Sequence, residues 1–220
     1  MKKTTSLLPI LLTCLKSYTL NAQDSSGLTK SPVPAEILIG NNRLFYQIII
    51  NKKITKNNKL GYFSTSSFAA DYNNEISKNE YLTTALLYCN IFKSLSVNSG
   101  ATLNTIEGLK PFVGLQYTYT KKNIMFFYLP AYYYLSSQKI SNFAFIEYKP
   151  GINNHWAGYS KLQVNYIYDI GKNYHFRSYI YSRLGLTYSN LTFGAGANLD
   201  WYGETKKLKE NYGLFLKLNL

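Results

Sequence analysis

Hydrophobic and polar residues alternate with a period of two along most of the chain. Between Leu191 and Tyr202 every second residue is apolar, and the residues between them are mostly glycine or polar. The segments 95–104 and 214–220 alternate in the same way. Successive side chains of a strand point to opposite faces, whereas a helix repeats about every 3.6 residues. The pattern therefore predicts β-strands.

The alternation marks eleven clear strands in all. They are 43–54, 60–71, 80–92, 95–104, 109–120, 123–135, 140–149, 157–169, 175–188, 191–202 and 214–220. Many of them exceed the roughly 5 to 6 residues of an average soluble strand and reach the about 9 to 11 residues that a tilted transmembrane strand needs. In hydrocarbon every backbone N–H and C=O group requires a partner, so such a sheet must close. We therefore expect an all-β, closed antiparallel transmembrane β-barrel.

The connections between the strands allow the strand number to be inferred. Tight connections lie near 93–94, 121–123 and 189–190, and longer ones, such as 72–80 and 203–211, come between them. Outer-membrane barrels have short periplasmic turns and longer external loops. If the tight turns are periplasmic, the strand at 43–54 needs a partner before it, and Glu36–Gly40 is the only candidate. This predicts twelve strands, with ten as the alternative if 36–54 is less regular.

Composition supports a membrane barrel and excludes two other classes of protein. Hydrophobic residues make up 46% of the chain and charged residues only 16%, which is too apolar for a disordered protein. Outside the N-terminus no apolar run approaches the about 20 residues of a spanning helix. Aromatic residues gather at the strand ends, as in the girdles of membrane barrels. They are Tyr117, Tyr119, Tyr132, Tyr133, Tyr134, Trp156, Tyr166, Tyr168, Tyr188, Trp201 and Tyr202.

The N-terminus has the features of a secretory signal peptide. Lys2 and Lys3 precede the short apolar run Leu7–Leu15, and a polar stretch follows up to cleavage near Ala22 or Gln23. We therefore assign residues 1–23 to a signal peptide, 24–35 to a short periplasmic segment and 36–220 to the barrel in the outer membrane. Removing residues 1–23 takes away three lysines and no acid, which lowers the net charge from +13 to +10.

The two cysteines offer little chemistry. Leu11–Cys14 faintly resembles a lipobox, so a lipidated Cys14 is the alternative to simple cleavage. After cleavage near residue 23 only Cys89 remains, which excludes an intramolecular disulfide and a thiolate metal cage. We expect Cys89 to act as a small apolar residue.

The chain resembles the small Gram-negative outer-membrane β-barrels. The features that carry this resemblance are the signal end Asn21–Gln23, the alternating strands and the strand that reaches Leu220. A terminal aromatic residue, usual in such proteins, is absent here, and Phe215 lies five positions before the end. The segments 147–150 and 193–198 are similar to parts of an uncharacterised barrel family. The resemblance implies the fold and no catalytic motif.

Folding the alternation into a barrel sorts the charged residues by face. Six of them fall on the polar face of the C-terminal strands and are candidates for contact with a solute. They are Glu147, Lys161, Arg177, Arg183, Asp200 and Lys217. Arg or Lys facing lipid at the midplane costs about 2–4 kcal/mol, which favours the interior. Such residues either select anions in a channel or form a paired network that fills a narrow barrel.

These observations predict a narrow porin-like channel for small solutes, with a mild preference for anions. One alternative is a closed structural or interaction barrel of the cell envelope that binds a partner protein. Another is an enzyme at the rim, for which His175, in a loop near Asp169 and three residues before Ser178, is the residue to test. Without a glycine-flanked serine or a paired-histidine motif, we expect no enzyme, cofactor or metal. The lysine clusters lack interleaved aromatics, so we expect no nucleic acid and place membrane lipid among the partners.

Overall fold

Twelve antiparallel strands form a single sheet that closes on itself. The computed structural model describes residues 32–220, except 56, 58, 74, 136 and 137. The strands are β1 (Pro34–Gly40), β2 (Arg43–Lys53), β3 (Leu60–Asp71), β4 (Glu80–Asn90), β5 (Leu95–Asn104), β6 (Gly108–Lys121), β7 (Ile124–Tyr133), β8 (Lys139–Tyr148), β9 (Trp156–Asp169), β10 (Tyr174–Tyr188), β11 (Leu191–Tyr202) and β12 (Lys207–Asn219). A short 3-10 helix, η1 (Ile76–Lys78), lies between β3 and β4. The twelve-stranded barrel is confirmed, and the ten-stranded alternative is wrong.

Pairing of the first strand with the last closes the barrel. Glu36 lies opposite Lys217, Leu38 opposite Phe215 and Gly40 opposite Gly213. A Cβ atom on Gly213 would lie 1.9 Å from the carbonyl oxygen of Ile39, so this seam requires glycine. The partner strand expected at Glu36–Gly40 is therefore present, and it begins two residues earlier. The expected signal peptide and Cys14 lie outside the described residues.

Most strand boundaries agree with the alternation to within two residues, but β12 does not. It begins at Lys207, so the connection before it covers only 203–206 and not the expected 203–211. Its first four residues, Lys207–Glu210, are exposed and carry three charges, so they show no apolar alternation.

Among the described residues, no helix combines the length and the apolar character needed to cross a membrane.

The expected contrast between short turns at one end and long loops at the other is wrong. The end that carries both termini of the sheet has the tight connections 122–123 and 189–190, but also the long connection 149–155. At the opposite end the connection 41–42 is tight and 72–79 is long. Within the 149–155 connection, Gly151 forms an isolated β-bridge with Ala157. This connection is therefore longer than a tight turn but is still held by β-type pairing.

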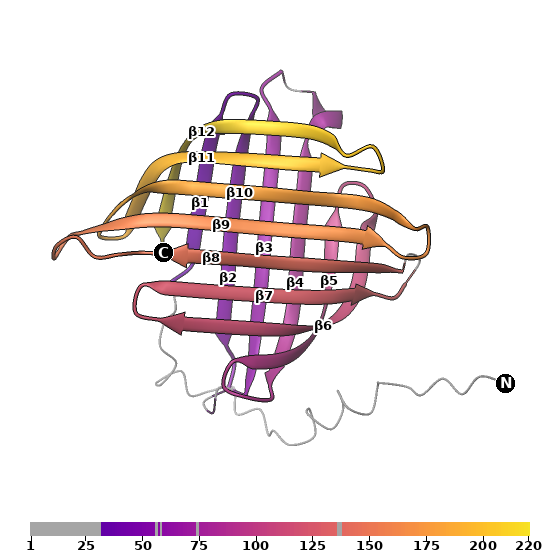
Figure 1. Ribbon diagram of the computed structural model, residues 1–220, viewed down its shortest axis with the longest axis horizontal. Helices are drawn as coiled ribbons and strands as arrows, with labels where there is room; N and C mark the ends of the chain where they lie inside the picture. Colours follow the sequence, from indigo (N-terminus) through magenta and orange to yellow (C-terminus); the bar gives the residue numbers. More distant parts are fainter. Residues whose placement is uncertain (1–31, 56, 58, 74, 136–137) are drawn as a thin grey trace. The chain divides into compact units, whose positions relative to one another are not determined.

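The strands on the two sides of the barrel cross in projection. In Figure 1, β7 to β11 run across β1 to β4, which lie behind them. Strands of a closed barrel are tilted by about 35–45° to its axis, so opposite walls cross in this way. The tilt brings side chains from distant parts of the sequence together in the interior.

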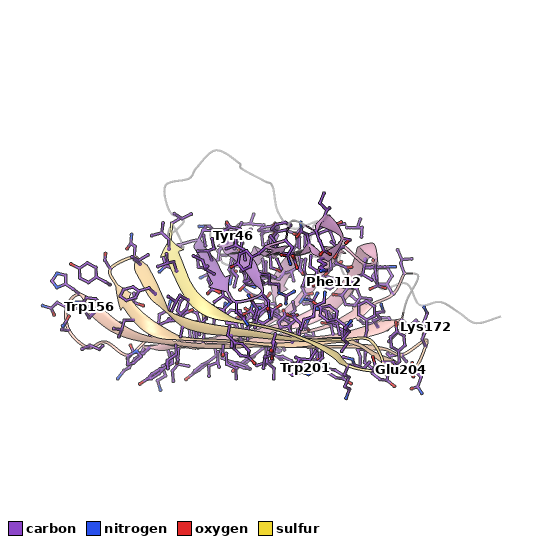
Figure 2. The ribbon with its side chains drawn as sticks, turned by 90° about the horizontal axis from the view of Figure 1, so that it is seen from above. Tyr46, Phe112, Trp156, Lys172, Trp201 and Glu204 are labelled. Atoms are coloured by element: carbon purple, nitrogen blue, oxygen red, sulfur yellow. The ribbon has the colours of Figure 1, made fainter. Side chains whose placement is uncertain are left out.

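Apolar residues occur on both faces of the wall. Leu184 and Leu214 project outward and are each 70% exposed, whereas Phe63, Phe127 and Phe145 are almost fully buried in the interior. Figure 2 likewise shows Phe112 between the strands and Trp201 on the outer surface. Most of the expected aromatic girdle points outward, but two of its members do not. The hydroxyl groups of Tyr133 and Thr102 share a hydrogen bond in the interior, and the hydroxyl of Tyr202 contacts Glu80 there.

Candidate functional site

All six predicted solute-contact residues face the interior of the barrel. They separate into two groups along the wall that β8 to β12 form with β1 and β2. Arg177 and Asp200 lie near the end opposite the termini, in what we call the mouth cluster. The other four lie deeper, in what we call the deep cluster. The deep cluster contains Glu147, Lys161, Arg183 and Lys217 of the predicted set, together with Glu36, Gln47 and Tyr159.

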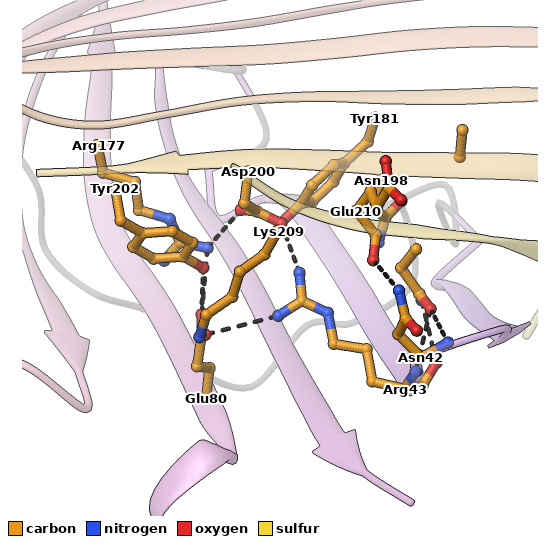
Figure 3. Close-up of polar contacts among 12 residues, drawn as sticks. Asn42, Arg43, Glu80, Arg177, Tyr181, Asn198, Asp200, Tyr202, Lys209 and Glu210 are labelled. Atoms are coloured by element: carbon orange, nitrogen blue, oxygen red, sulfur yellow. Dashed lines mark hydrogen bonds and ion pairs between the residues drawn. The ribbon is translucent and has the colours of Figure 1, made fainter. Parts of the chain in front are cut away.

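The mouth cluster is centred on the fully buried carboxylate of Asp200 (Figure 3). Its Oδ1 atom accepts a hydrogen bond of 2.7 Å from Arg177 Nη2, and its Oδ2 atom accepts one of 2.7 Å from Arg43 Nη2. The hydroxyl of Tyr181 donates to Oδ1 at 3.0 Å. One acid therefore joins strands β2, β10 and β11 through charge-assisted hydrogen bonds, which are the stronger kind.

Glu80 adds the opposite wall to the mouth cluster. Its carboxylate lies 3.5 Å from Arg43 Nη1 and 3.6 Å from Arg177 Nη2, and it accepts a 2.6 Å hydrogen bond from Lys209 Nζ. The hydroxyl of Tyr202 also donates to it. Glu80 begins β4, directly after the connection that contains η1. Its contacts therefore hold that connection against β10 to β12, across the end of the barrel (Figure 3).

The deep cluster begins with a second carboxylate that joins three strands. Glu147 Oε1 accepts hydrogen bonds from Lys217 Nζ at 2.7 Å and from the Tyr159 hydroxyl at 2.9 Å. Lys149 Nζ approaches the other oxygen of Glu147 to 3.2 Å from the edge of the barrel. Glu147, Lys217 and Tyr159 are all buried, so the pairing supplies the partners that a buried charge needs.

Arg183 continues the deep cluster toward β1. Its Nε donates to Glu36 Oε1 at 2.8 Å, and its Nη1 donates to Asn198 Oδ1 at 2.8 Å. Gly196 faces Arg183 across β10 and β11, and a Cβ there would lie 2.8 Å from Arg183 Cδ. The glycine thus makes room for the long side chain against the wall.

Lys161 has no carboxylate partner, unlike the other bases of the deep cluster. It is 6% exposed, and its Nζ donates to the neutral Gln47 Oε1 at 3.1 Å. No acid of the described residues lies within ion-pair distance of it. Three bases, Lys161, Arg183 and Lys217, therefore face two acids in the deep cluster, Glu36 and Glu147, which leaves one positive charge in excess.

Sequence reasoning missed several interior charges, because it examined only the C-terminal strands. Glu36, Arg43 and Glu80 come from β1, β2 and β4, and they complete the two clusters. Lys139 forms a third contact, at 2.5 Å from Glu107 and 3.3 Å from the centre of the Phe176 ring. The alternation could have predicted that Arg43 faces the interior, because Arg43 lies four residues from the polar Gln47 and therefore on the same face of the strand.

A layer of stacked aromatic rings from β3, β7 and β8 lies in the interior. Phe127 stacks on Phe63 at 4.6 Å and on Phe145 at 5.1 Å between ring centres. A cavity lined by residues such as Gln116 lies on the side of the termini, and one lined by residues such as Tyr133 lies on the other side. The two cavities share no lining residue. On the inner face of β7, Phe127 lies between Met125, which lines the first cavity, and Leu129, which lines the second, so the aromatic layer lies between the two cavities.

His175 does not lie in a loop with Asp169, so that expectation is wrong. His175 belongs to β10, pairs with Tyr168 and points to the outer surface. Asp169 is buried on the inner side, 3.8 Å from Lys139 Nζ. The alternation places neighbouring residues of a strand on opposite faces, which separates the two side chains by the barrel wall. The predicted proximity of His175 and Ser178, in contrast, is present.

No group of three or more potential ligands among His, Cys, Asp and Glu gathers to hold a metal ion within the described part of the chain. The interior is instead a set of charge-assisted pairs, with one excess cation in the deep cluster. Such an arrangement can bind and orient an anion.

Comparison with known proteins identifies the fold and not a family. No family model and no curated protein matches the chain. Among solved structures, the NanC porin has a TM-score of 0.52 at 12% identity, over 86% of this chain and 100% of that chain. The KdgM porin has a TM-score of 0.47 at 10% identity, over 86% and 99% of the two chains. LpxR from Salmonella typhimurium has a TM-score of 0.46 at 7% identity, over 86% and 100%. The likeness to the NanC porin shows that the fold is that of an outer-membrane β-barrel.

Proposed function

We propose that this protein is an outer-membrane barrel that acts as a narrow porin-like channel for small anionic solutes. The observation that carries the proposal is the excess positive charge of the deep cluster, at Lys161. Glu147 lies opposite Lys161 across β8 and β9, but Lys161 forms no direct ion pair with it. A buried ammonium group without a direct ion pair is costly, and a passing anion would supply that partner. Bases continue from Lys217 and Lys161 through Arg183 to Arg177 and Arg43, so an anion would meet a cation at each stage of its passage.

The outer surface supports a position in the membrane. Leu184 on β10 and Leu214 and Leu216 on β12 project outward with exposed fractions of 70%, 70% and 47%. A soluble monomer rarely exposes a continuous apolar surface of this kind, whereas a membrane barrel requires one. A cleaved signal peptide would bring the chain to the envelope, and the intact mass of the exported protein tests that step.

Conductance across a planar lipid bilayer tests the channel. With a KCl gradient, we expect discrete steps and a reversal potential that shows a preference for chloride. Lys161→Met removes the unpaired charge with little change in volume, so it should move the reversal potential toward cation preference. Lys121→Met removes the same charge from an exposed position and serves as the matched control. A chloride preference that survives Lys161→Met would overturn the role assigned to the deep cluster.

A closed structural barrel is the second candidate function. The aromatic layer of Phe63, Phe127 and Phe145 favours it, because the stacked rings lie between the two cavities and would narrow a path between them. An inserted and folded protein that shows no steps under any voltage would support this second function. It would then be expected to co-purify with another envelope component.

A further inference from the structure

A β-bulge brings a histidine and a serine together on the outer surface of β10. The pairing with β9 shifts between His175 and Arg177, so Phe176 and Arg177 both line the inner cavity. Residues three apart in a regular strand face opposite sides. The extra residue returns Ser178 to the same outer face as His175, where Nε2 and Oγ lie 3.0 Å apart. Bulges of this kind are common beside active sites.

The surroundings of His175 fix which of its nitrogen atoms carries the proton. Nδ1 lies 2.8 Å from the backbone carbonyl oxygen of Gly203. A carbonyl oxygen can only accept, so Nδ1 must donate, and the neutral ring then presents Nε2 as an acceptor. The Ser178 hydroxyl can donate only to that atom of the ring. This is the tautomer and the contact that activate a serine nucleophile.

The histidine and the serine lie in a cleft on the outer surface. The cleft has a volume of about 260 Å³ and is lined by Tyr166, His175, Ser178, Trp201 and Lys206. His175 is 6% exposed, so the base is shielded, whereas Ser178 is half-buried and reaches the cleft. The Tyr166 ring packs at 5.5 Å from the His175 ring. Aromatic walls with a cation beside them match a lipid at the level of its headgroup.

We propose that Ser178 and His175 form a catalytic dyad that hydrolyses an acyl ester of an anionic membrane lipid. The outer face of the barrel is apolar below the cleft, with Ile180 and Leu184 exposed on the same strand. An acyl chain can therefore lie along β10 while its ester carbonyl reaches Ser178. The ammonium group of Lys206 would face the negative headgroup.

The reaction follows from the positions of these groups. Ser178 Oγ attacks the ester carbonyl carbon while its proton passes to His175 Nε2. The bond from that carbon to the alcohol oxygen then breaks, and His175 returns the proton to the leaving alcohol. Water attacks the acyl-serine with His175 again as the base, which releases the fatty acid and restores Ser178. One ester and one water thus give one acid and one alcohol.

Gly203 and Lys206 assist the proposed dyad in different ways. The carbonyl group of Gly203 orients His175 and stands where many triads have a carboxylate. Lys206 is the cation that lines the cleft, where its ammonium group would face both the negative headgroup and the negative oxygen that forms on the ester. Gly203 and Lys206 both belong to the connection between β11 and β12. That connection therefore completes the site.

The test uses the full chain, expressed in a Gram-negative host and purified from membranes in detergent. A fluorophosphonate probe reports a reactive serine, and fatty acid release from phosphatidylglycerol micelles reports turnover. We expect Ser178→Ala and His175→Ala each to lower turnover by about 1,000-fold or more. Ser182→Ala, on the same face of β10, and His155→Ala, at the other end of the barrel, are matched controls that should leave turnover unchanged.

Each result has a definite meaning. A folded wild-type protein that neither reacts with the probe nor releases fatty acid would overturn the dyad. So would turnover that survives either Ser178→Ala or His175→Ala. Faster release from phosphatidylglycerol than from phosphatidylcholine, lost in Lys206→Met, would support the anionic substrate. Gel mobility of unheated samples confirms that each variant is folded. Conductance is measured separately, so the failure of the channel and of the dyad can be distinguished.

Discussion

Arg183 on β10 and Glu36 on β1 form an ion pair inside the barrel, although 147 positions separate them. Nε and Nη2 of the arginine both lie 2.8 Å from Oε1 of the glutamate. The side chains are 2% and 4% exposed, so the pair is fully withdrawn from solvent. Because β1 is the strand that closes the sheet, the pair ties the closing strand to the wall that carries the deep cluster.

Glu36→Ala should destabilise the barrel strongly, because it leaves the Arg183 guanidinium buried without an acid. Removing one partner of a buried pair costs about 3–5 kcal/mol in the free energy of unfolding. The double variant Glu36→Met with Arg183→Met should recover much of that loss, since it removes both charges. Urea unfolding in lipid vesicles, followed by tryptophan fluorescence, measures both changes.

The control for this prediction is an exposed ion pair. Glu75 lies 2.8 Å from Lys78 Nζ, with about half of each side chain exposed. Exposed pairs contribute little to stability, so Glu75→Ala should leave the unfolding midpoint in place. Equal effects of Glu36→Ala and Glu75→Ala would contradict the structural importance of the interior pair.

The fold was largely predictable because the membrane imposes it locally. Each strand has one apolar outer face, so the alternation shows directly where a strand lies. Even β1 followed from counting strand directions. The alternation does not mark a strand outside the membrane, where no apolar outer face is required. Lys207–Glu210 is such a segment, because its exposed and mostly charged residues extend β12.

The contacts between interior residues were not predictable to the same degree. Which acid meets Arg183 depends on the tilt and register of strands far apart in sequence, and neither is visible in the alternation. The aromatic layer was missed because Phe126 and Phe127 are adjacent and chemically identical, although they face lipid and lumen respectively. The bulge at 175–177 is equally hidden, since it changes the face of a residue without changing any residue type.

Neutralising Glu80 should loosen the mouth of the barrel. Its carboxylate contacts Arg43, Arg177 and Lys209, so Glu80→Gln removes the charge that holds the 72–79 connection against β10 to β12. We expect a larger fraction of time in the open state, and a stronger preference for chloride because a negative charge has left the path. Single-channel recording measures both. Glu204→Gln, in an exposed connection, is the control, and a shift toward cation preference in Glu80→Gln would contradict the prediction.

The orientation of the barrel can be tested on whole cells. If the termini are periplasmic, the 72–79 connection faces the medium and the 149–155 connection faces the periplasm. In a Cys89→Ser background, a membrane-impermeant maleimide should label Lys78→Cys in intact cells and Asn154→Cys only after the outer membrane is broken. Both positions are exposed, so accessibility within the folded protein does not distinguish them. The reverse labelling pattern would place the termini outside.

Removing one ring from the aromatic layer should connect the two cavities. Phe127 lies between Phe63 and Phe145, so Phe127→Ala takes out the ring that both others stack on. We expect a larger single-channel conductance, together with a loss of stability of about 3–5 kcal/mol from the cavity that remains. Phe126→Ala removes the same side chain from the lipid-facing side of the same strand and should leave conductance unchanged. If both variants conduct like the wild-type protein, the aromatic layer does not limit passage, and the path must follow the charged wall of the deep cluster instead.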